Sequence, residues 1–200
     1  MKSSYSRFAG VCAVLTGICG LLYLLAFVTI RDPSATLPAL LLLAAGILGS
    51  TVIVALYERV RGVDAGFALW GMLLAFAGAG GAAIHSAFDL SNDLHPPATA
   101  FAGASQIDPR GFLTFGIAGL GALVISWLLM RGGVLSRGVA ILGVVSGVLL
   151  IALYVAYLLL LDPANPLVVA LVLASGIAQP LWYLWLGALL WGASAEMAGR

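Results

Sequence analysis

Long apolar stretches, separated by short polar segments, dominate this chain of 200 residues. Six of them are long enough to cross a bilayer as helices, because a helix rises about 1.5 Å per residue and the hydrocarbon core is about 30 Å thick. Charged residues are nearly absent from their interiors. The stretches run approximately over residues 8–30, 37–57, 67–87, 112–130, 139–161 and 167–191. The pattern predicts an all-α, polytopic transmembrane bundle of six helices.

Uninterrupted apolar runs distinguish these helices from the strands of a transmembrane β-barrel. Such strands alternate apolar and polar residues, whereas residues 39–45 and 148–161 do not alternate. The first stretch, 8–30, exceeds the roughly 7–15 apolar residues of a signal-peptide core, so we expect a retained anchor. No linker or low-complexity tract marks a second domain, and residues 1–200 are expected to form a single transmembrane domain.

Composition narrows the class of protein further. Charged residues make up 8% of the chain and apolar ones 62%, against roughly 25% and 45–50% in soluble domains. Too few polar side chains remain to cover a water-facing surface, and basic residues are too sparse for a nucleic-acid partner. Cys12 and Cys19 would lie about 10.5 Å apart along one helix, too far for a disulfide, which needs less than roughly 7 Å. The expected partner is the lipid bilayer; a homo-oligomer or another membrane partner stays open.

Basic residues in the short connections predict the orientation, because Lys and Arg concentrate on the cytoplasmic side. Successive helices cross the membrane in opposite directions, so their ends and connections fall on two sides. One side holds seven of the nine basic residues, and the other side holds Arg31 and Arg110. We therefore expect both termini in the cytoplasm of a cell that carries the protein in its plasma or inner membrane. The seven expected cytoplasmic residues are Lys2, Arg7, Arg59, Arg61, Arg131, Arg137 and Arg200.

The segment 85–96 contains both histidines and forms the one polar constellation in the sequence. If the third helix continues through Asp93, then His85, Asp89 and Asp93 occupy positions i, i+4 and i+8 on one face near the outer boundary. His95 follows closely. Asp108 and Arg110 lie at the far end of the same outer connection.

Three interpretations of this constellation stay open. His85, Asp89, Asp93 and His95 carry the imidazole and carboxylate groups that suit zinc or another divalent metal. The same groups suit acid–base or proton-exchange work at a ligand site that would include Asp108 and Arg110. A purely structural helix end is the third interpretation. No catalytic residue and no cofactor other than this possible divalent metal is assigned.

Gln179 carries the one side-chain amide deep in a predicted span, beside Pro180. A polar group in lipid needs a partner, so Gln179 is expected to face the bundle interior, either as a ligand-binding residue or as a link between helices. Candidate partners are Thr114, Ser126, Ser146 and Tyr154. The 25 glycines, including the Gly143–Gly147 pair, favour close helix packing.

Several segments are similar to an uncharacterised family of bacterial six-helix integral membrane proteins, catalogued as a domain of unknown function. They are 55–57, 128–147 and 182–191, while 85–97 and 105–111 resemble an actinobacterial-type subgroup. Many members carry an Arg and a Glu within the third helix, where this chain has glycine and alanine. The resemblance implies the six-helix fold and a membrane location, and it implies no reaction.

Three functions are compatible with the sequence. The first is a non-enzymatic membrane protein, an accessory or a carrier of a small solute or lipid, with a cavity lined by Gln179, Tyr154 and small residues. The second is a membrane-embedded metal protein or enzyme that uses the outer His and Asp residues. The third is a structural bundle without a pocket.

Overall fold

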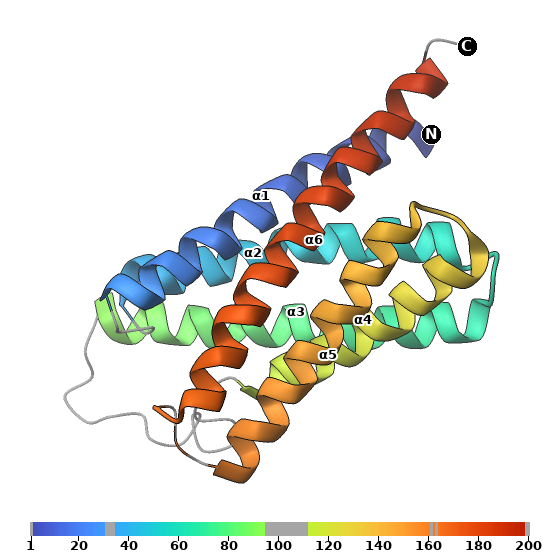
Figure 1. Ribbon diagram of the computed structural model, residues 1–200. Helices are drawn as coiled ribbons and strands as arrows, with labels where there is room; N and C mark the ends of the chain where they lie inside the picture. The colour runs from blue at the N-terminus through green and yellow to red at the C-terminus, as the bar shows by residue number, and fades with distance from the viewer. Residues whose placement is uncertain (1, 31–34, 95–111, 161, 163, 199–200) are drawn as a thin grey trace.

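Six long helices make up the protein, as the computed structural model shows for residues 2–30, 35–94, 112–160, 162 and 164–198 (Figure 1). All six contain a segment long and apolar enough to cross a membrane, and no strand occurs in these ranges. The predicted helical fold class is confirmed. The helices are α1 (Lys2–Ile30), α2 (Thr36–Val60), α3 (Ala65–Leu94), α4 (Phe112–Gly132), α5 (Arg137–Leu160) and α6 (Pro166–Ala198).

Short polar segments begin several of the helices. Asp64 Oδ1 accepts a hydrogen bond of 3.1 Å from the backbone N–H of Phe67 at the start of α3. Asn165 Oδ1 accepts one of 3.0 Å from Leu167 at the start of α6. Both satisfy backbone donors that the first helical turn leaves without a partner. Both termini, the α2–α3 turn and the α4–α5 turn lie at the same end of the bundle (Figure 1).

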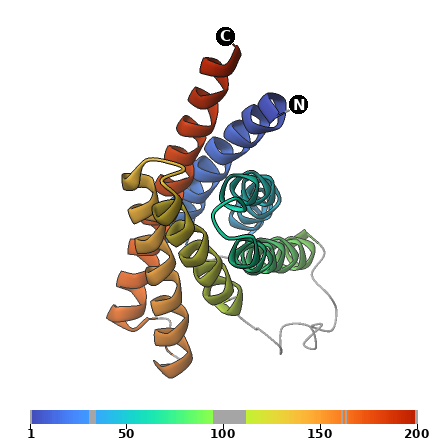
Figure 2. The same cartoon turned by 90° about the vertical axis from the view of Figure 1, so that its right-hand side faces the viewer.

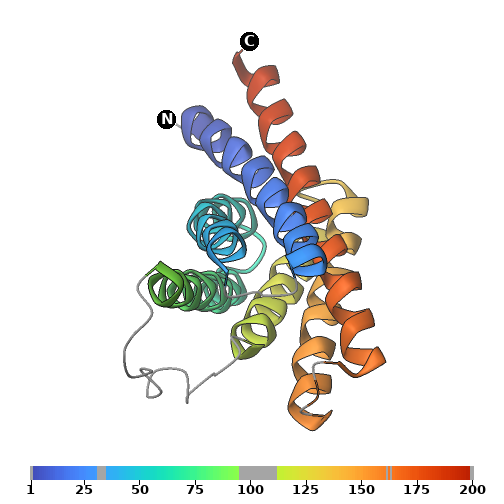
Figure 3. The same cartoon turned by 90° about the vertical axis from the view of Figure 1, so that its left-hand side faces the viewer.

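The helices close into a ring. Each helix packs against the next one in the chain, and α6 packs against α1; α2 also touches α4 across the ring. Views from the two sides show α2 and α3 running side by side, while α1 and α6 cross them at an angle (Figures 2 and 3). This closure leaves an interior that every helix can face.

Glycine permits the closest approaches between helices. A Cβ atom added to Gly147 of α5 would lie 2.7 Å from the carbonyl oxygen of Gly119 in α4, and one added to Gly119 would lie 2.7 Å from the carbonyl oxygen of Gly147. Likewise, a Cβ atom at Gly78 of α3 would lie 2.5 Å from the Cβ of Ala118 in α4. The backbones thus approach more closely than any larger residue allows, which is the packing expected of helices in lipid.

Gly143, the other member of the predicted glycine pair, lies at a junction of three helices. A Cβ atom there would collide with Ser126 Oγ of α4 and would lie 2.6 Å from Trp182 Nε1 of α6. These two atoms and Ser146 Oγ are buried and have no hydrogen-bond partner among the residues that the structure describes. The glycine therefore makes room for polar side chains inside the bundle.

Gly147→Ala should destabilise the protein by about 1–3 kcal/mol, because the new methyl group meets the fixed carbonyl of Gly119. The matched control is Gly80→Ala in α3, where an added Cβ would meet no described atom within 4 Å apart from its chain neighbours and its own helix backbone and where alanine favours the helix by roughly 1 kcal/mol. Thermal unfolding in detergent measures both variants. Equal unfolding temperatures would show that the α4–α5 contact does not depend on glycine.

Candidate functional site

A cavity of about 560 Å³ occupies the interior of the ring, and residues of all six helices line it. Its lining on α3 extends from Ala75 to Asp89, a distance of about 21 Å along the helix axis. The cavity is therefore elongated along the bundle. Its volume falls in the range of roughly 300–1,000 Å³ that is typical of small-molecule sites.

The wall of this cavity is mostly apolar, with small residues along α3. Gly78, Ala79 and Ala82 leave space where larger side chains would fill the interior. Polar side chains are few and come from α1, α3 and α6 in particular. They include Tyr23, His85, Asp89, Gln179 and Tyr183. An apolar chamber with a few polar groups is suited to a lipophilic molecule with limited polarity.

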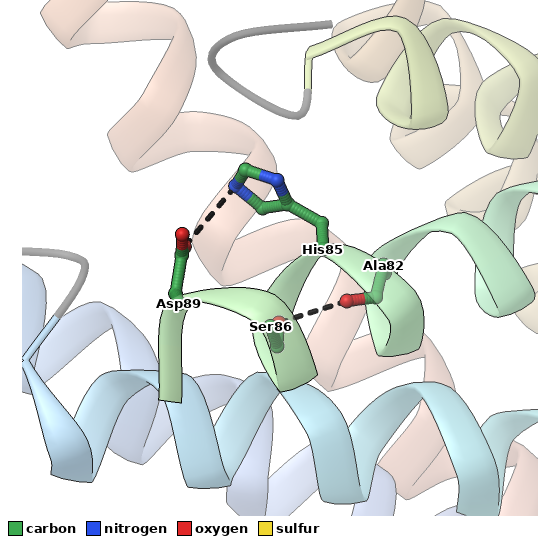
Figure 4. A network of polar contacts seen from close by, with 4 residues as sticks. All are labelled: Ala82, His85, Ser86 and Asp89. Atoms are coloured by element: carbon green, nitrogen blue, oxygen red, sulfur yellow. Dashed lines mark hydrogen bonds and ion pairs between the residues drawn. The ribbon is translucent and has the colours of Figure 1, made fainter. Parts of the chain in front are cut away.

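His85 and Asp89 form an ion-pairing contact one helical turn apart on α3, with His85 Nε2 3.2 Å from Asp89 Oδ2 (Figure 4). Both side chains are about a quarter exposed (26% and 22%). Between them, the buried Ser86 donates a hydrogen bond of 2.8 Å from its hydroxyl to the carbonyl of Ala82. A carboxylate beside an imidazole fixes the ring orientation and leaves Nδ1 as the second functional nitrogen.

Helix α3 continues to Leu94, so the predicted face of His85, Asp89 and Asp93 does form. The third carboxylate nevertheless takes a different partner, because Asp93 accepts a hydrogen bond from the hydroxyl of Thr36 at the start of α2. His85 and Asp89 line the cavity, and Asp93 instead links two helices. The remaining predicted residues, His95, Asp108 and Arg110, lie outside the described residues.

Gln179 faces the cavity, as predicted for an interior position. The prediction of its protein partners is wrong, because Gln179 makes no hydrogen bond within the part of the chain that the structure describes. Two of the predicted partners, Ser126 and Ser146, also have no hydrogen-bond partner among the described residues. Tyr154, predicted to line the cavity, packs against Gly116 instead. Tyr157 is the tyrosine that α5 contributes to the wall.

Tyr23 of α1 and Tyr183 of α6 are wall residues that the sequence did not single out. Tyrosines are common in membrane helices, and their hydropathy pattern does not separate a lipid-facing ring from a cavity-facing one. The four-residue spacing between Gln179 and Tyr183 could have identified Tyr183 as a wall residue, because residues at i and i+4 share a helix face.

The described residues supply only part of a metal site. Within the described ranges, no three or more His, Cys, Asp or Glu side chains gather as metal ligands would. His85 and Asp89 supply two donors, and a structural or catalytic zinc site has at least three protein ligands. Any further protein ligand would have to come from residues beyond those described.

Comparisons with protein-family models, with curated proteins and with solved structures find no match to this chain.

Proposed function

We propose that this integral membrane protein is non-enzymatic and binds a small lipophilic solute or lipid in its central cavity, as a carrier or as an accessory to one. The observation that carries this proposal is the chamber of about 560 Å³ that all six helices line. A bundle with a purely structural role would be expected to fill its interior, because close packing in lipid provides most of the association energy.

Blocking the chamber tests the proposal. Ala82 lines the cavity, whereas Ala77 on the same helix is exposed on the outer surface. In lipid nanodiscs, a diazirine derivative of 1-dodecanol should label peptides of the cavity wall in the native protein. Ala82→Leu should reduce this labelling several-fold because the added side chain occupies the chamber, and Ala77→Leu should leave it unchanged.

Two controls make the labelling experiment decisive. Ala45→Leu fills the same chamber from α2 and should reproduce the effect if Ala82→Leu acts through volume. Thermal unfolding in the same nanodiscs identifies any variant that has lost its fold. Labelling confined to the lipid-facing surface of the native protein would overturn the proposal.

We also propose that the protein lies in the plasma or inner membrane with both termini in the cytoplasm, and that it belongs to the uncharacterised bacterial six-helix family that it resembles. Arginines support this orientation, since Arg59, Arg61 and Arg131 lie at the end that holds both termini. Arg59 donates a hydrogen bond of 3.1 Å to Ser6, and Arg61 pairs with Glu58 at 3.0 Å.

Single cysteines on opposite ends test the orientation in a background with Cys12→Ala and Cys19→Ala. Gly62→Cys lies in the α2–α3 turn, where no atom crowds a new Cβ, and Ser91→Cys lies at the exposed outer end of α3. In right-side-out vesicles, an impermeant maleimide should modify Ser91→Cys at once and Gly62→Cys only after permeabilisation. The reverse pattern would invert the proposed topology.

A metal site is the second candidate function, and the contact of 3.2 Å between His85 and Asp89 favours it. A carboxylate that accepts a hydrogen bond from a metal-ligating histidine orients the imidazole ring in this way. Zn²⁺ titration of the purified protein, followed by calorimetry, should then show one site that both His85→Ala and His95→Ala abolish. Equal zinc uptake by the native protein and both variants would exclude this site.

A further inference from the structure

We infer that the cavity selects a neutral lipophilic molecule whose hydroxyl or carbonyl group binds Gln179 and Tyr183 in the middle of the membrane. This inference rests on the proposed function and adds the chemical class of the ligand. It depends on three features of the described residues, which are the depth of the two side chains, their lack of hydrogen-bond partners and the absence of charge around them.

Both side chains lie near mid-depth. Gln179 is halfway along the apolar segment Pro166–Gly192 of α6, and Tyr183 follows one turn later on the same face. The Tyr183 hydroxyl lies beside Gly49, where an added Cβ would be 3.3 Å away, near the middle of α2. At this depth no bulk water is at hand to satisfy polar groups.

Both side chains line the cavity, and neither has a hydrogen-bond partner in the part of the chain that the structure describes. The ring of Tyr183 packs against Trp182, with the ring centroids 5.2 Å apart, and this contact leaves the hydroxyl without a donor or acceptor. Neighbouring hydroxyls are already engaged by their own helices. Thr16 donates to the carbonyl of Cys12 at 2.8 Å, and Ser175 donates to the carbonyl of Leu171 at 2.7 Å. Gln179 and Tyr183 therefore present donors and acceptors to whatever fills the chamber.

Pro180 adds a further acceptor to the same wall. Proline has no N–H group, so the carbonyl of Gly176 lacks its usual donor four residues later. Gly176 and Pro180 both line the cavity next to Gln179. Helix α6 thus has a carbonyl without its usual intrahelical donor at Gly176, three residues before the amide of Gln179.

The charges of the wall favour a neutral ligand group. Of the described residues that line the cavity, His85 and Asp89 alone carry an imidazole or a carboxylate, and none is lysine or arginine. Ala79 of α3 lies against Gly46 of α2, and Asp89 is ten residues, about 15 Å, farther along α3. Tyr183 contacts α2 at Gly49, which is farther from Asp89 along the bundle than Gly46 is. An ammonium or carboxylate at the height of Tyr183 would lose its hydration without a counter-charge.

Competition against the photoactivatable dodecanol tests the inference. Unlabelled 1-dodecanol and 2-dodecanone should displace the probe from the cavity wall about tenfold better than dodecane, the difference expected from one or two hydrogen bonds. Dodecylamine and dodecanoate should compete no better than dodecane once membrane partitioning is measured for each compound.

Two substitutions assign the preference to the named side chains. Gln179→Leu and Tyr183→Phe remove the amide and the hydroxyl and keep most of the volume, so each should reduce the alcohol-over-alkane preference while cavity labelling persists. The matched control is Tyr154→Phe, a tyrosine of α5 outside the cavity wall, which should keep the full preference.

The outcomes separate the inference from the proposed function. Absence of cavity labelling in the native protein overturns both. Cavity labelling with equal competition by dodecanol and dodecane, or with dodecylamine or dodecanoate as the best competitor, overturns the inference and leaves the binding function standing. The inference alone is also overturned if both variants remain folded, as measured by thermal unfolding, and keep the alcohol-over-alkane preference of the native protein.

Discussion

A backbone amide or carbonyl without a partner in hydrocarbon costs several kcal/mol, and this penalty determines most of the architecture. It explains why the described residues are almost entirely helical. Side chains obey the same constraint, since the hydroxyls of Thr16, Ser86 and Ser175 bond to carbonyls of their own helices. Because these hydroxyls bond within their own helices, they do not hold one helix against another. The hydrogen bonds that do join helices, such as Thr36 to Asp93 and Arg59 to Ser6, lie near the helix ends.

Contacts between small residues provide that association, and the same residues shape the hollow centre. Gly119 and Gly147 bring the backbones of α4 and α5 together, and Gly78 does so for α3 and α4. Along α3, however, Gly78, Ala79 and Ala82 also line the cavity. A helix face made of small residues allows neighbours to approach at its edges and leaves its centre unfilled when the ring closes. Tight packing and an open chamber therefore have one cause.

The sequence predicted the six helices because bilayer thickness fixes the length of an apolar segment. It also placed Gln179 in the interior, since an amide is costly against lipid. It did not identify the partners of Gln179, because hydropathy does not encode how helices rotate about their axes in a closed ring. Ser126 faces Gly143 and Trp182, not the cavity wall beside Gln179. His85 and Asp89 were predicted as neighbours from their spacing alone, but their place in the same chamber as Gln179 depended on ring closure.

The polar groups of the chamber are difficult to explain by stability. Replacing an unpartnered buried polar group with an apolar one of similar shape is commonly neutral or stabilising, so a leucine at position 179 would serve a purely structural bundle at least as well. A serine hydroxyl avoids this cost by hydrogen-bonding to a carbonyl of its own helix. Gln179 and Tyr183 line the cavity and have no hydrogen-bond partner among the described residues. Binding sites are where proteins commonly retain features that do not favour stability. On the proposed function, a molecule in the chamber offsets the cost of these two side chains by supplying the hydrogen bonds that the described residues do not.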